Sequence, residues 1–434
     1  MKPVRNILLF LLISLCLLAS CEKNSQKSSA KIQEENPMNT NKTASSILSN
    51  PDYVAISYGG YRKDSREIQP TIEELKEDML LLHRMGIRIL RTYNVRLPHA
   101  SNVLKAIHEI KQEDENFEMY VMLGAWIDCK NAWTDLPLNH NEESEHNESE
   151  IARAVELANT YPDIVKIIAV GNEAMVKWAT AYYVQPHIIL KWVKHLQSLK
   201  EEGKLDKDVW ITSSDNFASW GGGETQYHTP ELNELIKEVD FISMHTYPMH
   251  DTHYNPVFWG IFPKEKSLSN QEKLDRAMTR SLNYAISQYD SVVSYMKGID
   301  VNKPVHIGET GWATKSKGMY GPEGTKAVDE YKQALYHQKM REWTKKNNIS
   351  CFYFQAFDEP WKDALHPMGS ENHFGLFTVD GKAKYVIWDE VDKGTFEGLS
   401  RGGNTIEKTY NGDLNNLLLE VQMPPLKQEI IPNH

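Results

Sequence analysis

The sequence predicts an α/β protein in which eight parallel strands alternate with helices and close into a single (β/α)₈ barrel. Short β-rich runs alternate with helix-like stretches all along the body of the chain, which is the pattern of a parallel sheet built from strand–helix units. Most of these runs are apolar throughout, as strands buried on both faces should be. The sequence shows no internal repeat and no second domain.

Helix signals separate the eight runs. Thr71-Ile72-Glu73-Glu74 is a capping box that opens a helix ending at Gly86, and Thr229-Pro230 and Ser269-Asn270-Gln271-Glu272 open two more. An open, doubly wound sheet is the main alternative, but Tyr58-Gly59-Gly60-Tyr61 lacks the spacing of the phosphate-binding turn that such a fold requires. In chain order, the runs are Tyr53–Tyr58, Ile87–Tyr93, Met119–Gly124, Val165–Gly171, Val209–Ser213, Val239–Met244, Val305–Gly308 and Cys351–Ala356.

The first residues have the pattern of a secretion signal rather than a membrane span. Basic residues precede an apolar run from Ile7 to Leu18, and small residues then precede Cys21 in Leu18-Ala19-Ser20-Cys21. This segment resembles the bacterial lipobox, which implies cleavage before Cys21 and acylation of its thiol. We therefore expect a lipoprotein signal peptide at residues 1–20. The mature chain would be secreted and anchored by lipid at the outer membrane, cell surface or periplasm of a Gram-negative bacterium.

Composition predicts the remaining domain boundaries. Residues 21–50 are rich in Lys, Asn, Ser, Gln and Glu, so they bury too little apolar surface to fold and are predicted to be a flexible tether. Residues 51–395 form the predicted barrel domain. Residues 396–434 form a C-terminal tail with weak periodicity, which we expect to lie across the barrel as a strap.

Charge and cysteine content exclude several classes of protein. Loss of the basic residues Lys2 and Arg5 with the signal peptide takes the formal net charge from −11 to −13. No nucleic-acid partner is expected, because such an acidic chain is repelled by phosphates. With Cys16 in the leader and Cys21 acylated, the remaining two cysteines are too few for a disulfide framework or a cysteine zinc site.

Polar and aromatic residues gather just after the predicted strands, where (β/α)₈ barrels carry their active sites. Carboxylates and amides bind sugar hydroxyls, and aromatic faces cover the apolar faces of pyranose rings, so this set of groups predicts a sugar site. The residues are Arg91, Tyr93, Trp126, Asp128, Asn172, Glu173, Asp215, Asn216, His245, Tyr247, Glu309, Trp312, Asp358, Glu359, Trp361 and Lys362.

Two of these residues have the chemistry for cleaving a glycosidic bond. Cleavage needs a carboxylic acid to protonate the leaving oxygen and a carboxylate to attack or stabilise the anomeric centre. Glu173 ends the fourth predicted strand and Glu309 the seventh, on opposite sides of the barrel mouth. We expect a separation of about 5 Å, the geometry of a retaining enzyme. Repulsion between the two carboxylates would raise one pKa and leave the other group ionised.

Four motifs occur at these strand ends in the expected order. They are Ile89-Leu90-Arg91-Thr92-Tyr93-Asn94, Val170-Gly171-Asn172-Glu173, Gly308-Glu309-Thr310-Gly311-Trp312 and Phe354-Gln355-Ala356-Phe357-Asp358-Glu359-Pro360-Trp361-Lys362. In these motifs the chain resembles glycoside hydrolase family 17, the β-1,3-glucanases of the clan of retaining (β/α)₈ barrels. The resemblance covers residues 50–392.

The resemblance implies roles for individual residues. It implies Glu173 as acid/base and Glu309 as nucleophile, acting internally on laminarin-type β-1,3-glucan without a cofactor. Around this pair it places Asn172 at the sugar 2-hydroxyl, Tyr93 beside the nucleophile, and Glu359 and Lys362 on the flanks.

Other interpretations remain open at this stage. Asn172 and Glu173 would also suit a helix cap, and Glu359 would suit a structural turn with Lys362 as its ion-pair partner. Transfer of the sugar to a second sugar would use the same residues as hydrolysis, so a β-1,3-glucan transglycosylase is one alternative. A non-catalytic surface glycan-binding lipoprotein is another, although the presence of both glutamates argues against it.

The aromatic residues and the loops are less specific signals. Trp312 is our first choice as a sugar platform, ahead of Trp126 and Trp361, because a tryptophan at a strand end is core or rim as often as it is a ligand surface. Residues 128–149 and 249–269 form long loops that depart from the family, and such loops change the cleft that selects the substrate rather than the reaction.

The histidines do not indicate a metal. His245, His250 and His253 lack the spacing of a His-Glu-x-x-His site, and no predicted helix holds them on one face. No metal is therefore expected, and His245 and Tyr247 are assigned to the sugar site through ring and hydroxyl hydrogen bonds.

Overall fold

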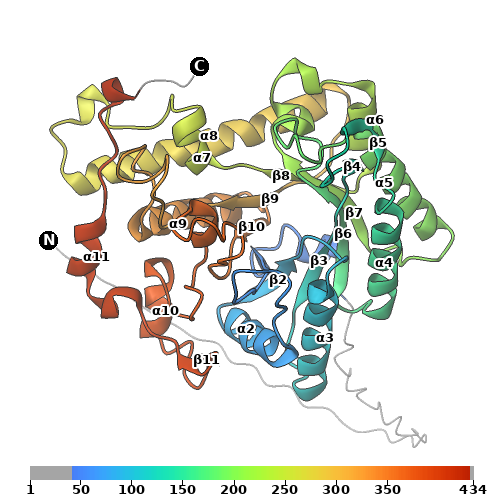
Figure 1. The fold of residues 1–434 in the computed structure, drawn as a ribbon, viewed down its shortest axis with the longest axis horizontal. Helices are drawn as coiled ribbons and strands as arrows, with labels where there is room; N and C mark the ends of the chain where they lie inside the picture. Colours follow the sequence, from blue (N-terminus) through green and yellow to red (C-terminus); the bar gives the residue numbers. More distant parts are fainter. Residues whose placement is uncertain (1–41, 431–434) are drawn as a thin grey trace, which may run out of the picture. The chain divides into compact units, whose positions relative to one another are not determined.

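Eight parallel strands close into a barrel in the computed structural model, which describes residues 42–430 (Figure 1). The order around the barrel is β1-β10-β9-β8-β7-β6-β3-β2. Each of the eight predicted runs is one of these strands, with ends displaced by a few residues, so the predicted (β/α)₈ fold is confirmed. The strands are β1 (Val54–Ser57), β2 (Ile87–Arg91), β3 (Tyr120–Ala125), β6 (Val165–Asn172), β7 (Trp210–Asn216), β8 (Ile242–His245), β9 (Val305–Gly311) and β10 (Cys351–Phe354).

Helices connect the strands and cover the barrel. The capping boxes predicted at Thr71 and Ser269 are present, and the Thr229 hydroxyl accepts the Leu232 N–H at 3.2 Å at the start of a third helix. The α-helices are α1 (Ala44–Ile47), α2 (Ile72–Arg84), α3 (Pro98–Glu113), α4 (Asn147–Thr160), α5 (Pro186–Glu201), α6 (Pro230–Glu238), α7 (Pro248–Tyr254), α8 (Asn270–Gly298), α9 (Glu330–Lys346), α10 (Trp388–Asp392) and α11 (Leu414–Glu420).

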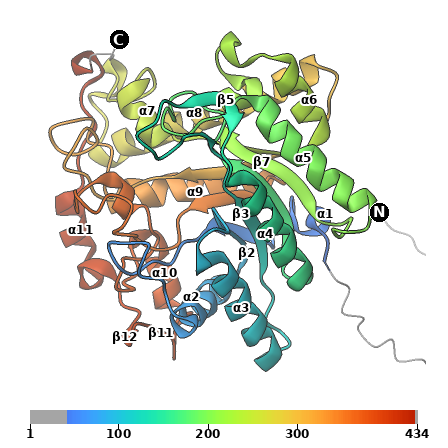
Figure 2. The ribbon, with the colours of Figure 1, turned by 45° about the vertical axis from the view of Figure 1, so that its right-hand side comes forward.

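Shorter elements lie in the connections. Two small antiparallel hairpins are formed by β4 (Cys129–Lys130) with β5 (Asn139–Glu143) and by β11 (Ser400–Arg401) with β12 (Asn404–Thr405). Figure 2 shows the β4–β5 hairpin beside α5. A π-helix spans Ala218–Gly222, and 3₁₀ turns span Thr225–Tyr227, Pro263–Glu265, Ser370–His373, Tyr385–Ile387, Thr409–Gly412 and Lys427–Glu429.

The end of the predicted tether belongs to the folded barrel. Ala44, Ile47 and Leu48 are buried and pack with the residues that fill the barrel interior, among them Ile89 and Phe352. The first described residues therefore close the barrel at the amino ends of its strands. The prediction that residues 21–50 form a tether is wrong for its last part, because this short helix buries apolar side chains that the polar composition around it concealed.

The C-terminal segment is also integral to the domain. After β10 the chain forms only the five-residue α10 where a full helix would complete the outer ring. The following segment reaches α2 through β11 and α9 through α11, and residue Leu426 pairs with Ile261 in an isolated bridge. The predicted strap is therefore present, but the boundary at residue 395 does not separate it from the barrel.

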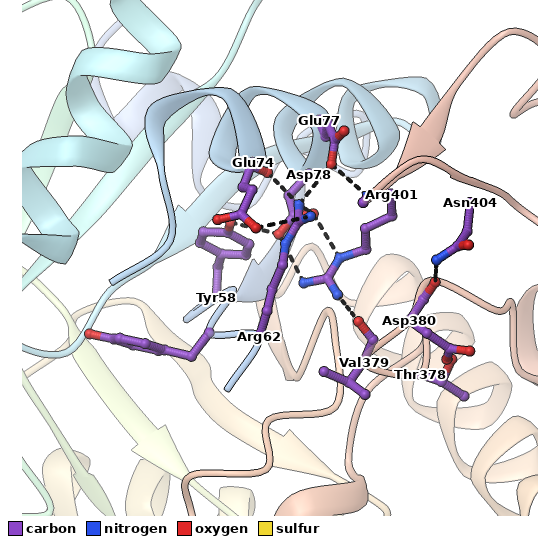
Figure 3. Close-up of polar contacts among 12 residues, drawn as sticks. Tyr58, Arg62, Glu74, Glu77, Asp78, Thr378, Val379, Asp380, Arg401 and Asn404 are labelled. Atoms are coloured by element: carbon purple, nitrogen blue, oxygen red, sulfur yellow. Dashed lines mark hydrogen bonds and ion pairs between the residues drawn. The ribbon is translucent and has the colours of Figure 1, made fainter. Parts of the chain in front are cut away.

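A buried ionic network fastens this segment to α2 (Figure 3). Arg401 Nε lies 2.8 Å from Asp78 Oδ1, and Arg62 Nη2 lies 3.2 Å from the same oxygen. The Tyr58 hydroxyl donates to Asp78 Oδ2 at 2.9 Å. Asp78 and Arg401 are both almost fully buried, so neither charge is shared with solvent.

The predicted signal peptide, the acylation site Cys21 and most of the predicted tether lie outside the described residues. Within residues 42–430, no helix is long and apolar enough to cross a membrane. Cys129 and Cys351 are free and buried.

Candidate active site

Glu173 and Glu309 lie at the carboxyl ends of β6 and β9, and Arg91 at the end of β2 connects the two strand ends. One Arg91 guanidinium nitrogen binds the Glu309 carboxylate, and the other lies 2.5 Å from Asn172 Oδ1, next to Glu173 in the chain. Arg91 is 1% exposed, so it lies beneath the site and holds both strand ends. The structure thus brings the two predicted glutamates to one end of the barrel.

The backbone at Glu173 adopts an unusual conformation. Its φ of 46° lies in the left-handed region, which costs a non-glycine residue about 1–2 kcal/mol. Gly171, two residues earlier, has φ of 82°, and a Cβ there would lie 2.9 Å from the Ala174 Cβ. The Glu173 N–H donates to Ser214 O at 2.9 Å and fixes this turn to β7. Strain of this kind persists where the surrounding structure enforces it and is concentrated at functional residues.

Both carboxylate oxygens of Glu309 accept hydrogen bonds. The Tyr247 hydroxyl donates to Oε1 at 2.5 Å, and the Tyr93 hydroxyl donates to Oε2 at 3.0 Å. Burial alone would raise the pKa of Glu309, but interactions with His245, the Arg91 guanidinium and the Tyr247 hydroxyl lower it to about 2. Glu309 is therefore ionised at neutral pH, as an attacking carboxylate must be.

Glu173 experiences the opposite environment. Burial and the negative charge of Glu309 raise the pKa of Glu173 to about 8, although Arg91 offsets part of this. His245 Nδ1 lies 3.1 Å from Glu173 Oε1, and burial lowers the pKa of His245 to about 4, so that its ring is neutral at neutral pH. One protonated and one ionised carboxyl group, set apart by their surroundings, match the roles of acid and nucleophile.

A second polar cluster lies in the segments that follow β10 and β1. Glu359 is 1% exposed and accepts the Tyr61 N–H and the Trp361 Nε1–H, each at 3.2 Å. Lys362 Nζ lies 3.6 Å from Glu359 Oε2, which confirms the predicted ion pair, and 4.6 Å from the centre of the Phe354 ring. Trp361 is half-buried, and its ring meets that of Tyr61 edge-on. The cluster therefore presents a fixed aromatic and cationic surface beside Glu309.

Five of the residues predicted to contact substrate are fully or almost fully buried, namely Arg91, Asp215, His245, Trp312 and Glu359. Trp312 is fully buried, donates its Nε1–H to Ala327 O at 2.8 Å and packs against Trp259, so it is a core residue and not a sugar platform. Asp215 is also fully buried and accepts the N–H of Met175 at 2.7 Å, which supports the loop after Glu173. A position just after a strand does not specify whether the side chain faces the barrel mouth or the surrounding core.

The other predicted residues lie near the mouth or support it. Trp126, Asn172, Asn216, Tyr93 and Tyr247 are half-buried. His245 is fully buried, and its Nδ1 contacts the Glu173 carboxyl group. Among residues 42–430, no group of three or more His, Cys, Asp and Glu side chains is arranged to hold a metal ion.

Sequence reasoning missed an ion pair and an aromatic group at this end of the barrel. His250 Nε2 on α7 lies 3.5 Å from Glu371 Oε1, and its ring stacks on Tyr247. Tyr182 stacks on the ring of Trp133 and contacts the ring of Trp126, which is tilted by 45°. Tyr182 and Tyr183, which are adjacent in the sequence after Glu173, could have indicated the aromatic group. Nothing in the sequence pairs His250 with Glu371.

With this geometry established, comparison with known proteins decides the family. A family model for the BtgE/BtgC glycoside hydrolase domain matches residues 55–375. The chain belongs to this family. This glycoside hydrolase is similar to the crystal structure of an endo-laminarinase from Formosa Hel1_33_131, with 68% sequence identity and a TM-score of 0.89, covering 91% of this chain and 100% of that one.

Curated relatives of the glycoside hydrolase support the same family. It is 36% identical over 245 residues to a glucan 1,3-β-glucosidase of Arthroderma benhamiae and 24% identical over 237 residues to a glucan endo-1,3-β-glucosidase of Vitis vinifera. These matches span 53% and 51% of this chain, and 64% and 66% of the length of the two relatives. The resemblance to β-1,3-glucanases drawn from the four motifs is confirmed.

A more distant structure shares the fold of the glycoside hydrolase. The Rhizomucor miehei β-1,3-glucanosyltransferase, an active-site mutant in complex with laminaritriose, has 21% identity and a TM-score of 0.53, and the match covers 77% of this chain and 96% of that one. At this identity the likeness establishes the barrel alone.

Proposed function

We propose that this glycoside hydrolase cleaves laminarin-type β-1,3-glucan internally by a retaining mechanism, with Glu309 as nucleophile and Glu173 as acid/base. The observation that carries the proposal is the pair of strand-end glutamates whose pKa values are shifted in opposite directions. The 68% identity to an endo-laminarinase supports the choice of substrate and of internal cleavage.

The mechanism uses each group in its resting protonation state. Glu309 attacks the anomeric carbon, forming a carbon–oxygen bond to the enzyme while the glycosidic bond breaks and Glu173 protonates the departing oxygen. Glu173 is then ionised and removes a proton from water, which attacks the anomeric carbon and releases Glu309. Two displacements restore the original configuration. Arg91, Tyr93 and Tyr247 hold the nucleophile in position throughout.

The test is release of reducing sugar and sizing of products from laminarin, with β-1,4-glucan, mixed-linkage glucan and β-1,6-glucan assayed in parallel. Wild type is compared with Glu309→Gln and with the matched control Glu234→Gln, a substitution on the surface of α6. Release of short oligosaccharides from laminarin by wild type and the control, but not by Glu309→Gln, is the expected result. Full activity of Glu309→Gln would overturn the assignment, and cleavage of a different glucan would overturn the substrate.

Hydrolysis and sugar transfer share the glycosyl-enzyme intermediate and are separated by the acceptor that attacks it. Products are therefore also sized at high concentrations of laminari-oligosaccharide. Products longer than the substrate would show a transglycosylase, whereas products that are all shorter than the substrate support the hydrolase.

We also propose that the mature chain is attached to a membrane by lipid on Cys21. Support comes from the sequence Leu18-Ala19-Ser20-Cys21 after an apolar run. The expected result is incorporation of radiolabelled palmitate and partition into the detergent phase for wild type, and loss of both for Cys21→Ala. An unlabelled wild-type protein in the aqueous phase would overturn the anchor.

A further inference from the structure

The loop after β3 carries an exposed tryptophan in a costly conformation. β4 and β5 form a hairpin there, and Trp133 in its turn is 62% exposed. The backbone φ of Trp133 is 62°, a left-handed conformation that costs a non-glycine residue about 1–2 kcal/mol. An aromatic side chain that is exposed at such a cost calls for a functional explanation.

Two contacts fix the orientation of the indole ring. Trp133 Nε1–H donates to Asp128 Oδ2 at 3.0 Å, and Asp128 itself is 4% exposed. The ring stacks on Tyr182 with centroids 5.4 Å apart and planes 22° from parallel. One face of the indole is therefore covered and its polar edge is bound, which leaves an apolar surface already ordered before any ligand arrives.

The hairpin is attached to the loop that follows Glu173. The Cys129 N–H donates to Tyr182 O at 3.0 Å, and the His140 ring stacks on Tyr183 at 3.7 Å. Burial raises the pKa of Tyr182, and the carboxyl groups of Glu173, Asp215 and Glu309 raise it further when they are ionised, so the phenol lies within electrostatic reach of the catalytic pair. Trp133 stacks on that phenol, and the aromatic group therefore extends outward from the catalytic pair.

The strand order places these aromatic residues on one side of the glycosidic bond that is cleaved. Trp126 and the hairpin follow β3, Tyr182 follows β6, and these strands are neighbours in the barrel. The Glu359 and Trp361 cluster lies across the barrel, after β10. In the first displacement the nucleophile and the leaving oxygen lie on opposite sides of the anomeric carbon, and Glu173 protonates that oxygen. The chain that leaves thus extends past Glu173, toward Tyr182 and Trp133.

We propose that Trp133, held by Asp128 and Tyr182, is a binding platform for the leaving-group half of a β-glucan chain, with its indole covering the apolar face of a pyranose ring. This inference rests on the proposed function and deepens it. The same platform would hold an acceptor sugar during transfer, because an acceptor attacks the intermediate from the position that the leaving group vacates.

The test compares a substrate that uses the platform with one that does not. Laminarihexaose offers sugars on both sides of the cleaved bond, whereas an aryl β-laminaribioside has only an aryl leaving group. For Trp133→Ala we expect kcat/KM on laminarihexaose to fall by about 5- to 10-fold, the range of a single aromatic contact, and kcat/KM on the aryl glycoside to stay within about 2-fold. Trp133→Phe keeps an aromatic face and should recover part of the loss.

Leu136→Ala is the matched control, because Leu136 lies on the same hairpin, is 61% exposed and is apolar but carries no ring. It should behave as wild type on both substrates. Equal losses on both substrates for Trp133→Ala, or an unchanged value on laminarihexaose, would overturn the platform. If wild type fails on laminarihexaose but cleaves the aryl glycoside, the proposed substrate fails instead, so the two failures are distinguishable.

Discussion

His245 lies with Nδ1 3.1 Å from Glu173 Oε1 and with Nε2 2.8 Å from the Ser214 hydroxyl. That hydroxyl is in turn 2.8 Å from the hydroxyl of Ser243, so a buried hydrogen-bonded row leads from the barrel interior to the proposed acid/base. A neutral imidazole carries one ring proton, and the partner of each nitrogen decides which one holds it. His245 is therefore a positioning residue that orients the Glu173 carboxyl group.

His245→Ala is predicted to lower kcat on laminarin by about 10- to 100-fold, because a small misplacement of a catalytic group has an effect of this size. KM should change little, since the fully buried ring does not reach substrate. His245→Asn retains a short polar group near Nδ1 and should recover part of the loss. Steady-state kinetics on folded variants make the measurement, and a change in KM alone would contradict the positioning role.

The opposite pKa shifts predict the pH dependence of activity. Glu309 must be ionised, so activity falls only at acid pH as the carboxylate is protonated, and its lowered pKa places this limb below the range of an ordinary glutamate. Glu173 must be protonated, so activity is lost as pH rises through its raised pKa, about 8. The profile of kcat/KM against pH for wild type measures both limbs. An alkaline limb near the pKa of an ordinary glutamate would contradict the assignment.

Removing the negative charge of Glu309 should lower the raised pKa of Glu173. In Glu309→Gln the negative charge that raises the pKa of Glu173 is gone while the Arg91 guanidinium remains, so the pKa of Glu173 is predicted to fall. Titration of ¹³C-labelled glutamate by NMR measures this in the inactive variant. A group that still titrates near pH 8 would show that burial alone raises the wild-type pKa.

Azide can distinguish the two glutamates by the configuration of the product. In Glu309→Ala, azide occupies the nucleophile's side, forms a bond to the anomeric carbon and displaces an activated aryl group, which gives the α-glycosyl azide. In Glu173→Ala, Glu309 still forms the intermediate, and azide then attacks from the opposite side to give the β-glycosyl azide. Proton NMR of the products reads the configuration, and the reverse pattern would exchange the assigned roles.

The eight strands and the catalytic pair could be predicted because their signals are local. Strands buried on both faces are apolar throughout, so each run was visible in the sequence, and Glu173 and Glu309 each sit in a recognisable strand-end motif. The β4–β5 hairpin could not be predicted, because β5 reads Asn-His-Asn-Glu-Glu and lacks the alternation of a strand. Its stability comes from contacts with the loop after Glu173, which are distant in sequence.

Errors about burial arose where local sequence does not determine packing. Trp312 follows a catalytic strand directly, yet its side chain joins the core with Trp259 and Tyr336. Ala44 and Ile47 lie in polar surroundings, and only the open amino end of the barrel explains why they are buried. In each case the decisive partner is far away in the chain.

The ion pair between Arg401 and Asp78 provides a stability prediction for the C-terminal strap. Removing one partner of a buried pair leaves an uncompensated charge, so Arg401→Met is predicted to lower the free energy of unfolding by about 3–5 kcal/mol. Lys393→Met is the matched control, because Lys393 also pairs with carboxylates near the C-terminus but its side chain is 60% exposed. Loss of this exposed pair should cost far less than loss of the buried Arg401 pair. Urea unfolding measures both variants.

Urea unfolding of these two variants also tests whether the C-terminal strap unfolds cooperatively with the barrel. If the strap unfolded independently of the barrel, Arg401→Met would leave the main transition in place and add an early one at low urea. A single transition that shifts as a whole is expected instead, because Arg401 binds Asp78 within α2 and Asp78 holds Tyr58 beside the strand end of β1. Equal costs for Arg401→Met and Lys393→Met would show that Arg62 alone satisfies Asp78 and that the strap is fastened elsewhere.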